Sequence, residues 1–134
     1  MALVNERGQA AGGLPAGVQP VEITLRKRAR VLVVRFSDGY QAELAAEYLR
    51  VHSPSAEVKG HSAGEGVLVT GKENVGIERV EPVGRYAVRL VFDDGHNTGL
   101  YTWPILYELG RHHDRNWERY LERLGKAGKS RTAT

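Results

Sequence analysis

Residues 33–40 read Val-Val-Arg-Phe-Ser-Asp-Gly-Tyr, an apolar run that leads directly into an Asp-Gly turn. Residues 90–96 repeat the pattern as Leu-Val-Phe-Asp-Asp-Gly-His, with Phe92 in the place of Phe36. Asp-Gly supplies the positive φ of a tight hairpin turn. After each turn, a short polar run precedes an apolar stretch. The repetition predicts a compact domain made of two related hairpin–helix halves.

Periodicity predicts the remaining elements. Alternation of apolar and polar residues indicates strands, and apolar residues spaced three and four apart indicate helices. We expect Pro104 in the first turn of a helix, and Gly110 and Gly125 at the ends of two helices. The fold class is therefore α+β, a compact single domain with an antiparallel-rich sheet of β-hairpins and short helices. The predicted strands are 21–26, 30–36, 40–44, 67–70, 75–80, 86–92 and 99–103, and the predicted helices are 45–51, 104–110 and 117–124.

Composition sets the limits of the domain. The chain has 134 residues, of which 41% are hydrophobic, enough for one core. Residues 1–20 are rich in glycine and proline, so we expect a flexible lead. The domain itself is expected at 21–124, followed by a flexible basic tail at 125–134.

Several classes of protein are excluded or disfavoured. The chain has no cysteine, which rules out disulfides, thiolate zinc sites and cysteine-ligated iron–sulfur clusters. We expect a cytoplasmic protein, because no apolar run is long enough for a bilayer and the first residues lack the pattern of a signal peptide. Nucleic-acid binding is disfavoured: the basic cluster at 26–30 is expected to open a strand, and the other basic residues lie in the tail.

Two longer segments carry a family resemblance. Residues 49–61 read Leu-Arg-Val-His-Ser-Pro-Ser-Ala-Glu-Val-Lys-Gly-His, and residues 83–103 run from Val-Gly-Arg-Tyr through Asp-Asp-Gly-His to Tyr-Thr-Trp. Both resemble the gamma-butyrobetaine hydroxylase-like N-terminal domain family, over about 21–124. The resemblance implies one compact unit of β-hairpins and short helices. Stand-alone bacterial members are small proteins of unassigned function.

The resemblance also implies possible chemistry. In carnitine-synthesis hydroxylases this domain holds a structural zinc through three cysteines and a histidine. The aligned cysteine positions here are Ser53, Ser55 and Val58, and only His96 could correspond to the histidine, so that zinc site does not carry over. The domain is also fused to P-loop ATPases that carry iron–sulfur clusters. That fusion implies an accessory role in iron–sulfur metabolism, with such an ATPase as partner.

Two functions from different classes follow. The leading hypothesis is a non-enzymatic protein-interaction module, linked to iron–sulfur or metalloprotein maturation. Substitution of Asp94 and His96 is expected to weaken partner binding and leave the fold intact. Related halves and an exposed edge strand are also compatible with a homodimer. The contact surface is predicted to contain Ser53, Pro54, Ser55, Glu57, His61, Asp94, His96, Tyr101 and Trp103.

The alternative is a divalent-metal protein. His61, His96 and Asp94 have side chains that bind zinc or iron, although their spacing alone does not bring them together. A hydrolase built on Ser53 or a neighbouring serine is disfavoured, because the sequence shows no nucleophile elbow and no third group to orient a base.

Overall fold

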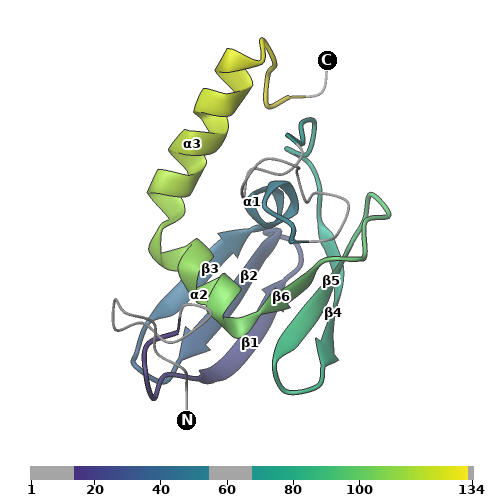
Figure 1. Ribbon diagram of the computed structural model, residues 1–134. Helices are drawn as coiled ribbons and strands as arrows, with labels where there is room; N and C mark the ends of the chain where they lie inside the picture. Colours follow the sequence, from purple (N-terminus) through teal and green to yellow (C-terminus); the bar gives the residue numbers. More distant parts are fainter. Residues whose placement is uncertain (1–13, 55–67, 133–134) are drawn as a thin grey trace.

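The computed structural model describes residues 14–54 and 68–132, which form two three-stranded antiparallel sheets and three helices (Figure 1). The strand orders are β1-β2-β3 and β4-β5-β6. The predicted α+β class is confirmed, and its hairpins are divided between two sheets. Among the described residues, no helix is both long enough and apolar enough to cross a membrane.

Both halves have the same order of elements. Each sheet has a shift in register on its first strand, opposite the phenylalanine that ends the middle strand. The first half contains β1 (Pro20–Arg26), β2 (Val31–Phe36), β3 (Gln41–Ala45) and α1 (Ala46–Val51). The second contains β4 (Ile77–Val83), β5 (Ala87–Phe92), β6 (Leu100–Thr102) and α2 (Trp103–Arg111), and α3 (His113–Lys126) follows it. The duplication seen in the sequence is therefore a duplication of structure.

One hydrophobic core serves both sheets. Alternate residues of β2 and β5 point into this core, and Val33, Ala87 and Val91 on the opposite faces of these strands are also buried. Leu106 of α2 and Leu49 of α1 join the same cluster. The inward residues of the two middle strands are Leu32, Val34, Phe36, Val88, Leu90 and Phe92.

Each half also stabilises the helix of the other half. The Tyr48 hydroxyl of α1 donates a hydrogen bond to the Leu109 carbonyl near the end of α2, at 2.6 Å. The Tyr101 hydroxyl of β6 donates to the Leu49 carbonyl near the end of α1, at 2.5 Å. Carbonyls near the end of a helix lack partners within that helix, so these two bonds satisfy them from across the molecule.

Gly110 does not end α2, contrary to the prediction. The helix continues to Arg111, and Gly110 lies where α2 crosses the first half. A Cβ atom at Gly110 would lie 2.5 Å from the Tyr40 hydroxyl and 2.8 Å from the Ala42 Cβ. The glycine is needed because the helix packs closely against β3 and its turn.

The end and the beginning of α3 also differ from the prediction. The helix begins at His113, before the expected Trp117, and it passes through Gly125 to Lys126. Gly128, with φ +67°, is the residue in the left-handed conformation that ends the helix. The Lys129 amide donates to the Leu124 carbonyl at 2.8 Å, which is the bond that closes a Schellman motif.

Three predictions about strands were wrong. Residues 68–70 form no strand, and the Val69 carbonyl instead accepts a hydrogen bond from Tyr120, at 2.6 Å. The predicted strand at 75–80 is shifted to Ile77–Val83, because Val75 closes a turn through its amide bond to the Lys72 carbonyl. The basic cluster at 26–30 does not open a strand; β1 ends at residue 26, and the next four residues form the turn to β2.

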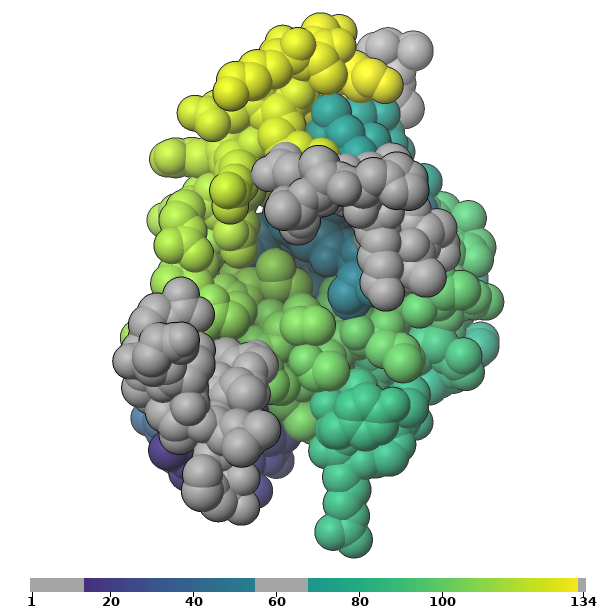
Figure 2. Space-filling model, viewed as in Figure 1, coloured from purple at the N-terminus to yellow at the C-terminus, as the bar shows by residue number. Residues whose placement is uncertain are grey.

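The chain beyond α3 contacts the first half. The Arg131 guanidinium binds both carboxylate oxygens of Glu47, on α1, at 2.7 and 2.8 Å. The Arg131 carbonyl accepts a hydrogen bond from the Gly71 amide, at 3.0 Å. In Figure 2 this yellow segment lies directly against teal residues of the segment that precedes β4. Part of the predicted tail is therefore placed by specific contacts.

Candidate functional site

The first Asp-Gly turn is held by its own backbone and by one carboxylate oxygen. The Phe36 amide donates to the Tyr40 carbonyl at 2.8 Å, and the Gly39 amide donates to the Phe36 carbonyl at 3.0 Å. Gly39 has φ +90°, which favours glycine. Asp38 Oδ1 accepts a hydrogen bond from the Tyr40 amide at 2.9 Å, so the aspartate is part of the turn.

The second turn has the same arrangement. The Phe92 amide donates to the His96 carbonyl at 2.9 Å, and the Gly95 amide donates to the Phe92 carbonyl at 3.2 Å. Gly95 has φ +92°. Asp94 Oδ1 accepts a hydrogen bond from the His96 amide at 3.0 Å. The two turns thus have the same backbone geometry. They differ in what binds the second carboxylate oxygen of each aspartate.

The free oxygen of Asp94 binds two cations. Arg50 Nε lies 2.9 Å and Lys72 Nζ 2.7 Å from Asp94 Oδ2, and the Asp94 side chain is only 19% exposed. Desolvation acts to raise the pKa of Asp94. Hydrogen bonds from Lys72, the His96 amide and Arg50 outweigh it and lower the pKa to about 2. Asp94 is therefore an ionised carboxylate that joins α1, the turn and residue 72.

The free oxygen of Asp38 binds a neutral group. The Tyr107 hydroxyl, on α2, donates to Asp38 Oδ2 at 2.7 Å. This hydrogen bond is the main cause of a lowered pKa at Asp38. Tyr107 and Arg50 occupy corresponding positions in their helices, since each is the fifth residue after the N-cap. Each helix thus reaches the Asp-Gly turn of the opposite half.

His96 lies beside Ser53, the first of the aligned cysteine positions. Ser53 Oγ and His96 Nε2 form a hydrogen bond of 2.9 Å, and Ser53 is only 4% exposed. A Cβ atom at Gly99 would lie 2.5 Å from Ser53 Oγ. The pair has the atoms of a nucleophile and a base, but Ser53 is buried and the Gly99 backbone packs closely against its hydroxyl.

The structure brings together only part of the predicted contact surface. Ser53, His96 and Asp94 are neighbours, and a Cβ atom at Gly99 would also contact Pro54. Tyr101 is buried beneath them. Trp103 is separate: its indole Nε1 donates to the Arg85 carbonyl at 2.8 Å. Ser55, Glu57 and His61 lie outside the described residues.

The contacts of Asp94 change two of the predictions. Within residues 14–54 and 68–132, no three histidine, aspartate or glutamate side chains are grouped closely enough to hold a metal ion. A metal bound to Asp94 Oδ2 would have to compete with Arg50 and Lys72. Substitution of Asp94 is also expected to affect stability, contrary to our first expectation, because it would leave both cations without their carboxylate.

Sequence reasoning missed the groups that surround these turns. Arg50 stands beside Leu49 in the resemblance segment, but nothing in the sequence links it to Asp94, 44 residues away. Lys72 and Tyr107 carry no motif. The only signal in the sequence that could have identified them was the internal repeat. It shows that Arg50 and Tyr107 occupy equivalent positions, but only once the first residues of the two helices are known.

Exposed apolar side chains lie near the edge of the second sheet, and the pairing of Arg89 with Leu100 places Leu100 on the face opposite to that of Tyr86. Tyr86 is 56% exposed and Leu100 is 38% exposed. The Trp103 amide donates to the Tyr86 carbonyl at 3.4 Å, and β6 pairs only with β5 within its sheet. We call Tyr86, Leu100 and Trp103 the β6 edge.

Comparisons with known proteins agree on one family. The family model described as gamma-butyrobetaine hydroxylase-like, N-terminal, matches residues 23–107. Two solution structures determined by NMR are similar. One has 52% sequence identity and a TM-score of 0.72 and covers 84% of this chain and 89% of its own. The other has 50% identity and a TM-score of 0.75, with 87% of each chain covered.

A crystal structure at 1.93 Å resolution is also similar. It is a protein of unknown function from Acidithiobacillus ferrooxidans, a member of the DUF971 family. It has 44% identity and a TM-score of 0.59, and the match covers 69% of this chain and 92% of that one. No curated protein matches the chain.

Proposed function

The chain belongs to the gamma-butyrobetaine hydroxylase-like N-terminal domain family, and from this premise we propose that it is a non-enzymatic accessory module that acts by binding another protein. The observation that carries the proposal is the β6 edge. Large apolar side chains exposed beside a short edge strand are typical of surfaces that bind proteins.

The geometry around the second turn supports a structural use of its polar residues. Asp94 is held by Arg50 and Lys72, and His96 is held by Ser53. These groups are engaged with one another in the described chain, so they are poorly placed to act on a substrate. Their role in the proposal is to position the loop that leads into β6.

The β6 edge offers two means of binding. Leu100 provides apolar area on one face of the edge and Tyr86 on the other, and aromatic residues are enriched among the residues that dominate binding energy. β6 is also the last strand in the order of its sheet, and such a strand is the element to which β-augmentation adds a further strand. Trp103 is held by the Arg85 carbonyl, so its ring is already fixed before a partner binds.

For the partner, we propose a P-loop ATPase that carries an iron–sulfur cluster. The support is the family resemblance, because the same domain is fused to such ATPases in other proteins. A stand-alone domain would then make, between two chains, the contact that the fused proteins make within one.

The test is affinity measurement between the full chain and such an ATPase. Leu100→Asp is expected to weaken binding at least about 10-fold, because it places a charge in an apolar contact. Leu121→Asp is the matched control, since Leu121 is 43% exposed on α3, away from the β6 edge. Equal binding by Leu100→Asp and the unmodified chain would contradict the surface. Absence of binding to the ATPase would contradict the partner.

A further inference from the structure

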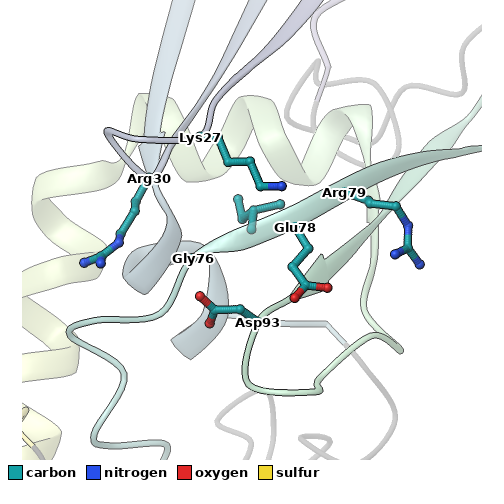
Figure 3. Close-up of a pocket in the computed structure, with 7 residues that line it drawn as sticks. Lys27, Arg30, Gly76, Glu78, Arg79 and Asp93 are labelled. Carbon is teal, nitrogen blue, oxygen red and sulfur yellow. The ribbon is translucent and has the colours of Figure 1, made fainter.

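A cavity of about 360 Å³ lies where the first hairpin meets the start of β4 (Figure 3). Its floor is formed by Gly76 and Ile77, which are both buried. Lys27 and Arg30 line it from the turn between β1 and β2. Glu78 and Asp93 line it from the second half. We call this cavity the seam pocket; its size is at the lower end of the range for small-ligand sites.

The four charged side chains do not pair with one another. None of Lys27, Arg30, Glu78 and Asp93 makes a side-chain hydrogen bond or ion pair with another described residue. In Figure 3 the Lys27 side chain extends along one side of β4, and the Glu78 and Asp93 carboxylates lie on the other side. The neighbouring Arg79 is different, because it is bound to Glu81 at 3.1 Å. The pocket therefore has a cationic wall at Lys27 and an acidic wall at Glu78 and Asp93. With Arg30 and Arg79, its lining carries three cations and two carboxylates.

The internal repeat shows that the fold does not require these charges. The positions that correspond to Arg30, Glu78 and Asp93 in the opposite half are Tyr86, Val21 and Ser37. The corresponding hairpin of the second half, whose turn is residues 84–86 instead of 27–30, is therefore built without these charges. The charges are a property of the seam pocket alone.

Two backbone features also point to this pocket. Arg30 has φ +58°, the one non-glycine residue with positive φ in the described chain, whereas the hairpin of the second half uses Gly84 at φ +56°. Residues held in the left-handed region are concentrated at functional sites. A Cβ atom at Gly76 would lie 2.9 Å from Asp93 Oδ2. The glycine thus allows the Asp93 carboxylate to lie against the floor.

We propose that the seam pocket binds a small zwitterion of the free α-amino acid class. The ligand carboxylate would lie against Lys27, whose side chain is on the side of β4 opposite to the two carboxylates, and hydrogen bonds between charged groups are stronger than those between neutral groups. The ligand ammonium would lie against Glu78 and Asp93. A zwitterion matches walls of opposite sign, and an ion of one sign would meet repulsion from one wall.

The test is an NMR titration of the full chain with L-alanine, L-glutamate and L-lysine, observed at the amides of Gly76 and Ile77. At least one of these amino acids is expected to cause saturable shifts with a dissociation constant below about 1 mM. N-acetyl-L-alanine and L-alaninamide each lack one charged pole, and both are expected to bind at least about 10-fold more weakly than L-alanine.

Substitutions assign the binding to the two walls. Lys27→Gln and Glu78→Gln are each expected to weaken binding at least about 10-fold. Arg28→Gln is the matched control, because Arg28 lies in the same turn and does not line the pocket. The proposal is overturned if none of the three amino acids causes saturable shifts, if N-acetyl-L-alanine binds as well as L-alanine, or if Arg28→Gln weakens binding as much as Lys27→Gln.

Discussion

The two Asp-Gly turns have the same backbone and different chemistry. In the first turn, the free oxygen of Asp38 accepts a hydrogen bond from a neutral tyrosine, Tyr107. In the second, the free oxygen of Asp94 lies between Arg50 and Lys72. The aspartate is needed in both places to close the turn, but only in the second does it neutralise cations from other segments. The comparison shows that one local motif can serve two different tertiary contacts.

Substitution of each aspartate in turn should show most clearly how much each of these contacts contributes to the stability of the protein. Asp94→Ala is expected to lower the free energy of unfolding by about 2 kcal/mol. This is less than the roughly 3–5 kcal/mol for a fully buried pair, since solvent still reaches part of the carboxylate. Asp38→Ala is expected to cost less, because no cation is left unpaired. Urea denaturation of both variants measures the difference, and an equal loss in the two would break the comparison.

The helix crossings provide the next comparison. At corresponding places, Gly110 lies against Tyr40 of the first turn, and Ser53 lies against His96 of the second. Gly110→Ala is expected to destabilise the protein by about 1 kcal/mol, because overpacking against Tyr40 and Ala42 exceeds the gain in helix propensity.

Gly125→Ala is the control for helix propensity. Gly125 is also within a helix, but its Cβ would have no atom within 4 Å. Alanine there is expected to raise the melting temperature slightly, whereas Gly110→Ala lowers it. If both variants were stabilised, close packing would not be the reason for Gly110.

Acid titration should sharpen the difference between the carboxylates. Folding lowers the pKa of Asp94 from its ordinary value of 3.8 to about 2. The stabilising contribution of Asp94 is therefore complete above pH 3.8 and is lost as the pH falls toward 2. In Asp94→Asn, the loss of stability over this window is expected to be smaller than in the unmodified chain. Denaturation curves at several pH values measure the slope, and an unchanged slope would show that other carboxylates dominate.

Much of the fold could be predicted because its signals are local. The Asp-Gly turns, the alternation in β2 and β5 and Pro104 at the start of α2 each lie within a few residues of what they determine. The internal repeat in the sequence also predicted that the two halves have the same order of elements. Gly110 was misread because a glycine that ends a helix and one that allows close packing look the same in sequence.

The site was predicted only in part, for a related reason. Asp94 and His96 were identified because the repeat singles out their turn. Arg50, Lys72 and Ser53 reach that turn from segments that are distant in sequence, so their contacts exist only after folding. The seam pocket is formed by a turn of one half and a strand of the other. Hydrophobic periodicity within one segment cannot predict which distant segments come into contact.

The reciprocal bonds of Tyr48 and Tyr101 have a consequence for folding. Each hydroxyl belongs to one half and satisfies a carbonyl in the helix of the other. If either half opens, it removes a hydrogen bond from its neighbour and exposes the core that both share. We therefore expect this chain, which contains the same architecture twice, to unfold as a single cooperative unit in one transition.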